Sequence, residues 1–187
     1  MDWLIVGLGN PGARYEGTRH NVGRAAVEAL ARASGIALDQ LKHQARFGAG
    51  RISGARVCIV VPTTYMNLSG RAVAPIARFY QVPVERVLAV YDDMDLPIGR
   101  LRLRAGGGHG GHNGMRSLIE LLGSDRFPRL RLGVGRPPAG WDPADHVLAR
   151  FSPEEAPAAA VLVDDAVAVL TDIVQRGVEA AMNRANA

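Results

Sequence analysis

Cysteine is almost absent from this 187-residue chain, which carries only Cys58. A single cysteine excludes an internal disulfide and fits a protein that works in a reducing cytosol. Cys58 lies in the segment Arg-Val-Cys-Ile-Val-Val, which has the pattern of a buried strand. We therefore expect it to fill the core rather than to act as a nucleophile.

Long hydrophobic runs are also missing, since no apolar stretch approaches the ~20 residues of a transmembrane helix. The start of the chain, Met1-Asp2-Trp3, lacks the basic region of a signal peptide. Both features lead us to expect a cytoplasmic protein without membrane contact. The sequence shows no repeats or low-complexity segments, and its 48% of hydrophobic residues suits one globular domain over residues 1–187.

Lysine is nearly absent as well: Lys42 is the only one, and arginine supplies the rest of a formal net charge of +4. Residues 99–104 and 126–131 hold much of this charge, with arginine and leucine alternating at the period of a strand. Such a row of guanidinium groups is either a solvated strand face or a surface that binds a polyanion. Arginine is the better of the two basic residues for binding phosphate.

Apolar periodicity and turn signals divide the chain into strands and helices. The predicted strands cover about residues 3–9, 44–52, 55–61, 86–91, 100–104 and 130–134, with a hairpin turn at 53–54. The predicted helices begin at a cap on Asn21, near residue 68 and at 115, and a capping box at 152–155 opens one long terminal helix. This order predicts an α/β fold, a single three-layer domain whose mixed, partly parallel, twisted sheet is flanked by helices.

The segment from Gly106 to Gly114 holds six glycines within nine residues, together with His109, His112 and Asn113. Such a run cannot pack a core and loses much backbone entropy on folding. A flexible surface loop is the plain alternative, but a linker has no need of two imidazoles and a carboxamide. Because the predicted helix follows directly, we expect the loop to end at a helix N-terminus, where free N–H groups favour anions or oxyanions.

The segment Gly7-Leu8-Gly9-Asn10-Pro11-Gly12 matches the glycine motif of dinucleotide-binding proteins. In that motif the helix begins among the glycines, whereas here the helical pattern starts only after Asn21. No second strand ends in an acidic residue about 20 positions further on, where the ribose would be bound. We therefore interpret the match as accidental and residues 9–21 as a substrate loop. NAD(H) titration would detect the alternative, a nucleotide-dependent oxidoreductase.

Polar side chains stand at the predicted ends of several strands and of the glycine loop; they are Asn10, His20, Asn67, Asp92 and Asn113. Ligands of open α/β sheets bind at the carboxyl ends of the strands, so these groups are expected to converge. A His–Asp pair among neutral carboxamides suits an ester or amide substrate, with the histidine as base. It does not suit zinc, for which carboxamides are poor ligands, and no serine lies in a nucleophile elbow.

Each of these residues also has an ordinary structural interpretation. His20 fits a surface or capping histidine, and Asp93 and Asp95 compete for any role given to Asp92. The asparagines at 67 and 113 are typical helix N-caps, and the one at 10, before a proline, is a typical turn former. Taken together, the five residues favour a functional site more than any one of them does alone.

Five segments of the chain, in order, resemble those of bacterial peptidyl-tRNA hydrolases. They are 6–12 (VGLGNPG), 18–21 (TRHN), 62–70 (PTTYMNLSG), 92–97 (DDMDLP) and 106–114 (GGGHGGHNG). The resemblance implies an enzyme that hydrolyses the ester between a peptide, or an N-blocked amino acid, and the terminal ribose of tRNA. It implies His20 as the general base, Asp92 as the residue that orients it and Asn10 as a further residue of the catalytic site.

The resemblance also implies where the substrate is bound. Contacts with the peptide or the tRNA are expected at Tyr15, Tyr65, Asn67, His112, Asn113, Arg102, Arg104 and Arg131. Tyr65 stands where many members of the family carry phenylalanine, which preserves a ring surface. No cofactor or metal is implied, and the family suggests a monomer. Because the family includes relatives that bind RNA in intron splicing, a non-catalytic RNA-binding protein is the alternative, although the retained His20 and Asp92 favour the enzyme.

Overall fold

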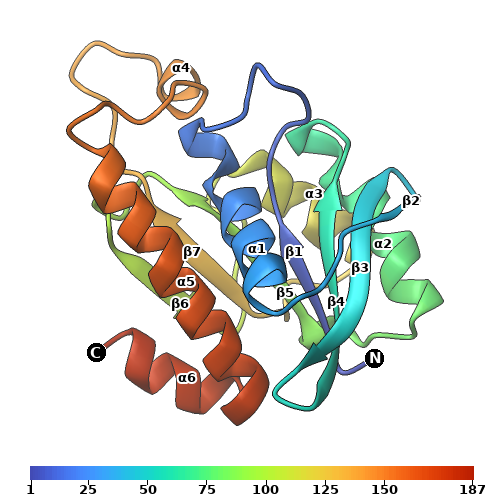
Figure 1. The fold of residues 1–187 in the computed structure, drawn as a ribbon. Helices are drawn as coiled ribbons and strands as arrows, with labels where there is room; N and C mark the ends of the chain where they lie inside the picture. Colours follow the sequence, from blue (N-terminus) through green and yellow to red (C-terminus); the bar gives the residue numbers. More distant parts are fainter.

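A mixed sheet of seven strands runs through the centre of the computed structural model, which describes all residues 1–187 (Figure 1). The strand order is β2-β3-β4-β1-β5-β7-β6, with β4, β1, β5 and β7 parallel and the other strands antiparallel to their neighbours. The strands are β1 (Trp3–Gly7), β2 (Gln40–Lys42), β3 (Ala45–Ile52), β4 (Ala55–Pro62), β5 (Val87–Asp93), β6 (Leu101–Arg104) and β7 (Arg129–Gly133). The predicted fold class is confirmed.

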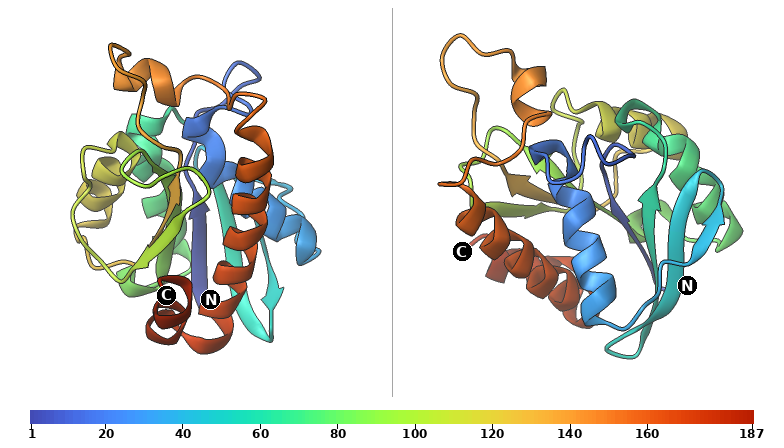
Figure 2. Two further views of the ribbon diagram at one scale, coloured as in Figure 1. Left: turned by 90° about the vertical axis from the view of Figure 1, so that its left-hand side faces the viewer. Right: turned by 45° about the horizontal axis from the view of Figure 1, so that its top comes forward.

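Helices cover both faces of the sheet (Figure 2). One face carries α1 (Val22–Ala33), α5 (Ala156–Arg176) and α6 (Val178–Ala185), and the other carries α2 (Ser69–Phe79) and α3 (Asn113–Leu122). The short α4 (Pro143–Val147) lies outside these layers, near the carboxyl ends of the parallel strands (Figure 1). None of the helices combines the length and the apolar character that crossing a membrane requires.

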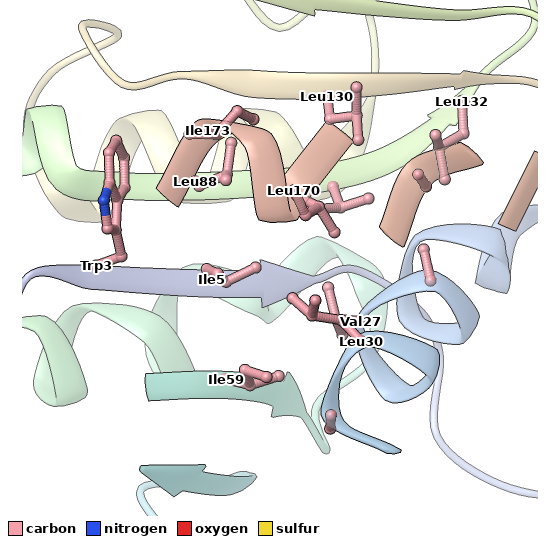
Figure 3. Close-up of a cluster of buried hydrophobic side chains, with 14 of the residues drawn as sticks. Trp3, Ile5, Val27, Leu30, Ile59, Leu88, Leu130, Leu132, Leu170 and Ile173 are labelled. Atoms are coloured by element: carbon pink, nitrogen blue, oxygen red, sulfur yellow. The ribbon is translucent and has the colours of Figure 1, made fainter. Parts of the chain in front are cut away.

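The central strands are buried on both faces, and their residues alternate between two apolar clusters. Ile5, Ile59 and Leu88 belong to the cluster under α1 and α5 (Figure 3). Leu4 and Cys58 face the opposite way, toward α2 and α3. Cys58 has no exposed surface, and burial raises the pKa of its thiol to about 12. The thiol is therefore protonated at neutral pH, as expected of a core residue.

The predicted hairpin and capping box are confirmed, but the terminal helix is not continuous. Ser152 and Glu155 form the box, since the Glu155 N–H donates to Ser152 Oγ at 3.2 Å and the Ser152 N–H donates to Glu155 Oε1 at 2.9 Å. The helix then ends at Gly177, whose φ of +88° is open to glycine alone. This turn directs α6 back to the sheet edge, where the Asn186 carboxamide makes two hydrogen bonds of 2.9 Å with the backbone of Leu103.

Two glycines let α1 lie directly on the sheet. A Cβ atom on Gly23 would stand 2.2 Å from the carbonyl oxygen of Val90 in β5, and one on Gly7 would stand 2.3 Å from a methyl of Val27. Real side-chain contacts do not reach such distances, so both positions require a missing side chain. The close approach fixes the first turn of α1, and with it the residues that precede the helix, over the ends of β1 and β5.

We expect Gly23→Ala to lower the free energy of unfolding by about 3 kcal/mol, because the added methyl meets strand backbone that cannot move aside. Urea denaturation followed by circular dichroism measures the change. Gly108→Ala is the matched control: it adds the same methyl where no atom lies within 4 Å, so its effect should stay within about 0.5 kcal/mol. Equal losses in the two variants would contradict the close approach of α1 to β5.

Candidate active site

The carboxylate of Asp92, near the end of β5, is bound by two histidines. His20 Nδ1 lies 2.8 Å and 2.9 Å from its two oxygens, and His112 Nε2 lies 2.8 Å from Oδ1. Only 2% of the Asp92 side chain is exposed, so the two imidazoles replace water as its partners. His20 belongs to a 3₁₀ turn (Arg19–Asn21) that leads into α1, and His112 directly precedes α3. The two histidines thus reach one carboxylate from opposite sides of the sheet.

Hydrogen bonds define the protonation of this cluster. His112 Nδ1 accepts the backbone N–H of Met115 at 3.2 Å, so its proton lies on Nε2 and is donated to Asp92. Burial by itself would raise the pKa of Asp92, but the adjacent His112 and His20 outweigh it and hold that pKa well below its usual range. The carboxylate is therefore ionised at neutral pH.

The other ring nitrogen of His20 has no protein partner. Because Nδ1 donates to Asp92, Nε2 carries the free lone pair of the neutral ring, and His20 contributes to the wall of the main cleft. The neighbouring acids are used differently: Asp93 accepts from Arg131 Nε at 2.5 Å, and Asp95 pairs with the exposed Arg136. Of the three acids, Asp92 is thus the one that contacts His20.

Asn10 is held at the cleft by a second set of hydrogen bonds. Its backbone N–H donates to Asn21 Oδ1 at 2.8 Å, and Asn21 Nδ2 donates to the Asn10 carbonyl at 2.9 Å. Its own Oδ1 accepts the N–H of Met66 at 2.8 Å, which leaves Nδ2 as the free donor. Asn21 was predicted to cap α1, but its carboxamide makes no cap bond because Asn10 occupies both of its ends.

The cleft around these groups has a volume of about 990 Å³. Its wall includes most of the predicted site residues, namely Asn10, His20, Tyr65, Asn67, Asp92, Arg104, His112, Asn113 and Arg131, together with the glycine loop from Gly106. Asn67 and Asn113 do not cap helices: Leu68 and His112 hold those positions. Both side chains are exposed, and neither carboxamide nitrogen has a protein partner. The glycine loop therefore leads into α3, as predicted, and it lines the cleft.

Two predicted residues do not line the cleft. The ring of Tyr15 stands edge-on to that of Tyr65 with 6.3 Å between centroids, so Tyr15 contacts a residue of the wall without lining the cleft itself. Arg102 lies on β6, paired in register with Arg131 of β7 and outside the cleft. The predicted row of free guanidinium groups is also incomplete. Arg129 is 2% exposed and donates to three backbone carbonyls, including that of Gly108 in the glycine loop.

The chain is similar to known proteins over nearly its whole length. The family model described as peptidyl-tRNA hydrolase matches residues 4–187. This chain belongs to the peptidyl-tRNA hydrolase family. The peptidyl-tRNA hydrolase of Exiguobacterium sibiricum is 51% identical over 182 residues, which are 97% of this chain and 98% of that protein. The chloroplastic peptidyl-tRNA hydrolase of Arabidopsis thaliana is 55% identical over 156 residues. These residues are 83% of this chain and 54% of the plant protein.

The fold is that of a crystallised peptidyl-tRNA hydrolase. The structure of the enzyme from Acinetobacter baumannii matches with a TM-score of 0.93 at 42% sequence identity, over 99% of this chain and 94% of that one. The glycine match at 7–12 is no dinucleotide site in this family member, since α1 begins only at Val22.

His20, Asp92 and His112 are also the one group of potential metal ligands in this chain, with ligand atoms all within 4.8 Å. Each of these atoms already takes part in a hydrogen bond of 2.8–2.9 Å with another member of the group. A metal ion would have to replace these bonds. As it stands, the arrangement is an ionised carboxylate bound by two imidazoles, and one of these imidazoles has a ring nitrogen without a protein partner.

Sequence reasoning missed several residues of the site. The bond from His112 to Asp92 depends on the path of the glycine loop, and the role of Asn21 depends on a turn eleven residues earlier. The wall formed by α4, with Pro143, Ala144 and Val147, lies in a segment where no helix is predicted from the sequence. One available signal was the sequence Asp142-Pro143, a cap followed by proline at the first helical position, and Asp142 does accept the N–H of Ala144 at 2.8 Å.

We expect Asn21→Ala to lower the free energy of unfolding by about 2 kcal/mol, because it leaves the buried N–H of Asn10 without a partner and its carbonyl with only a 3.3 Å bond from Arg24 Nη1. Chemical denaturation measures this loss. Asn67→Ala provides the control, since it removes an exposed carboxamide that forms no protein hydrogen bond. An Asn21→Ala variant as stable as Asn67→Ala would show that Asn21 does not hold the turn at Asn10.

Proposed function

We propose that this chain hydrolyses the ester that joins a peptide, or an N-blocked amino acid, to the terminal ribose of tRNA. The observation that carries the proposal is the state of His20, whose Nδ1 is bound to an ionised carboxylate while Nε2 is free at a cleft. Membership of the peptidyl-tRNA hydrolase family supplies the substrate class.

In the proposed reaction His20 acts as a general base on water. Nε2 takes a proton as the water oxygen bonds to the ester carbonyl carbon, which forms a tetrahedral oxyanion and an imidazolium. When the intermediate collapses, the bond to the ribose oxygen breaks and the imidazolium returns its proton to that oxygen. The products are free tRNA and a carboxylic acid. Asp92 stabilises the imidazolium through Nδ1 and keeps the ring in the productive tautomer.

Carboxamides are the proposed donors to the oxyanion. The Nδ2 group of Asn10 is held by the Met66 contact on its partner oxygen, which makes it a pre-positioned donor. Asn113 begins α3, and its Oδ1 accepts only a long 3.4 Å bond from Arg116 on the same helix. Asn113 lines the same cleft, and its Nδ2 has no protein partner. One well-placed donor of this kind contributes about 3–4 kcal/mol to the stabilisation of the transition state.

Arginines on β6 and β7 are the proposed contacts with the tRNA backbone. Arg104 lines the cleft, is exposed and has no acidic partner, so its whole charge is available to a phosphate. Arg102 is also unpaired, whereas Arg131 is bound by Asp93. We therefore assign the larger electrostatic contribution to Arg104 and a smaller one to Arg131. Phosphate contacts of this type bind without regard to sequence and weaken with added salt.

We expect His20→Ala to lower the turnover of N-acetyl-aminoacyl-tRNA by about 10³-fold, the usual contribution of a general base. The assay follows release of the N-acetyl amino acid with EDTA present, and fluorescence titration of labelled tRNA serves as the control. The affinity for tRNA should be unchanged, because His20 makes no phosphate contact in the proposal. Loss of binding with intact turnover of the bound complex would argue against His20 as the base. A wild type that binds tRNA without turnover would indicate an RNA-binding protein instead.

We expect Arg104→Ala to weaken tRNA binding and to reduce the slope of log K against log salt by about one, as for the loss of one phosphate contact. Arg131→Ala should change the slope less, because Asp93 already compensates that charge. Titrations at several salt concentrations measure both slopes. An unchanged slope in Arg104→Ala would place the tRNA backbone elsewhere on the protein.

A further inference from the structure

Arg19, the residue before His20, points away from the cleft and binds the segment that follows α4. Its Nη1 donates to the backbone carbonyls of His146, Ala149 and Arg150 at 3.2, 3.3 and 2.9 Å. Its Nη2 contacts Glu155 Oε1 at 2.5 Å, and its side chain is only 9% exposed. One guanidinium thus joins the turn that carries His20 to a segment about 130 residues further along the chain.

The acceptors of Arg19 lie at the C-terminal end of α4 and just beyond it. His146 lies in the last turn of α4, and the next two acceptors follow directly after that helix. The final carbonyls of a helix have no intrahelical donor, and a cation placed beside them is favourable. The backbone N–H of Arg19 also donates to Ala149 at 3.0 Å, and Thr18 forms a β-bridge with Arg150. The end of α4 is therefore held by the catalytic turn itself.

Glu155 connects this contact to the start of α5. The same Oε1 atom that accepts from Arg19 also accepts the N–H of Ser152, which is half of the capping box. The chain between α4 and α5 is thereby held at both ends by Arg19 and its ion pair. The segment before α4 is restrained by an exposed ion pair between Arg136 and Asp95 and by the 3.0 Å contact of the buried His146 Nε2 with the Gly135 carbonyl.

The position of α4 matters because its inner side is part of the cleft. Pro143, Ala144, Val147 and Leu148 line the cleft, and all four are apolar. This wall suits an acyl or peptide group and offers nothing to a phosphate. Arg19, which is next to His20 in the chain, thus links the turn that carries His20 to the helix that forms the apolar wall.

We propose that Arg19, paired with Glu155, is a positioning residue that sets the place of α4 relative to His20 and so determines how well the peptide part of the substrate is bound. The inference rests on the proposed function, since it assigns a substrate group to the α4 wall. Neither Arg19 nor Glu155 touches the substrate. Their loss therefore weakens substrate binding while the chemistry at His20 continues.

The test compares Glu155→Gln with Ser152→Ala, using N-acetyl-phenylalanyl-tRNA as the substrate. Glu155→Gln removes the charge that faces Arg19 yet keeps a side chain able to accept the Ser152 N–H. Ser152→Ala removes the other half of the capping box and leaves the ion pair in place. We expect Glu155→Gln to raise KM about fivefold with kcat changed less than twofold, the pattern of lost binding without lost chemistry. Ser152→Ala should leave KM within about twofold of the wild type.

Amide hydrogen exchange over residues 143–150 gives a readout that does not need turnover. Exchange there should accelerate in Glu155→Gln and in Arg19→Lys, whose single ammonium cannot serve the carbonyls and the carboxylate together. It should stay near the wild-type rate in Ser152→Ala. If the wild type hydrolyses the substrate but Glu155→Gln and Ser152→Ala share one KM and one exchange pattern, the inference is wrong. A wild type without hydrolysis overturns the proposed function instead, and the exchange data alone then decide whether Arg19 holds α4.

Discussion

The site depends on one buried carboxylate that must be ionised and fully hydrogen-bonded. Asp92 lies at the end of a strand buried on both faces, where an unpaired charge would cost several kcal/mol. Its two partners come from the turn before α1 and from the loop before α3. Those segments must meet at one point, so the register of β5, the close seating of α1 on Gly23 and the path of the glycine loop are all constrained together.

The two-residue period of β5 gives adjacent acids different partners. Asp92 lies on the same face of the strand as Leu88 and Val90, which face α1. Asp93 lies on the other face together with Tyr91, which is in register with Arg131 of β7. One acid is therefore compensated by imidazoles and the next by a guanidinium. A slip of one residue would exchange the two faces, and Asp92 would then face Arg131 instead of the two imidazoles. Strand register thus fixes which acid binds the histidines.

Sequence reasoning succeeded where short-range chemistry determines the outcome. The hairpin at Ser53-Gly54, the capping box at Ser152 and the strand that carries Asp92 near its end follow from local patterns, and the resemblance to a family indicated which polar groups converge. It failed where the partner lies far along the chain. The burial of Arg129, the use of Asn21 on Asn10 and the cleft wall from α4 are tertiary contacts, and a row of alternating arginines does not reveal which of them is covered.

The wall of the cleft has a basic part and an apolar part, and the proposed substrate has an anionic RNA part and an acyl part. Arg104 stands exposed in this wall without an acidic partner, whereas α4 contributes only apolar side chains. A polyanion that carries an apolar acyl group at its terminus would place its phosphates near the first and its acyl chain against the second. The ester between the two parts would then lie between those surfaces, beside Nε2 of His20. On this reasoning, free amino acids and bare RNA each fill only half of the cleft, and the geometry favours the covalent adduct of the two.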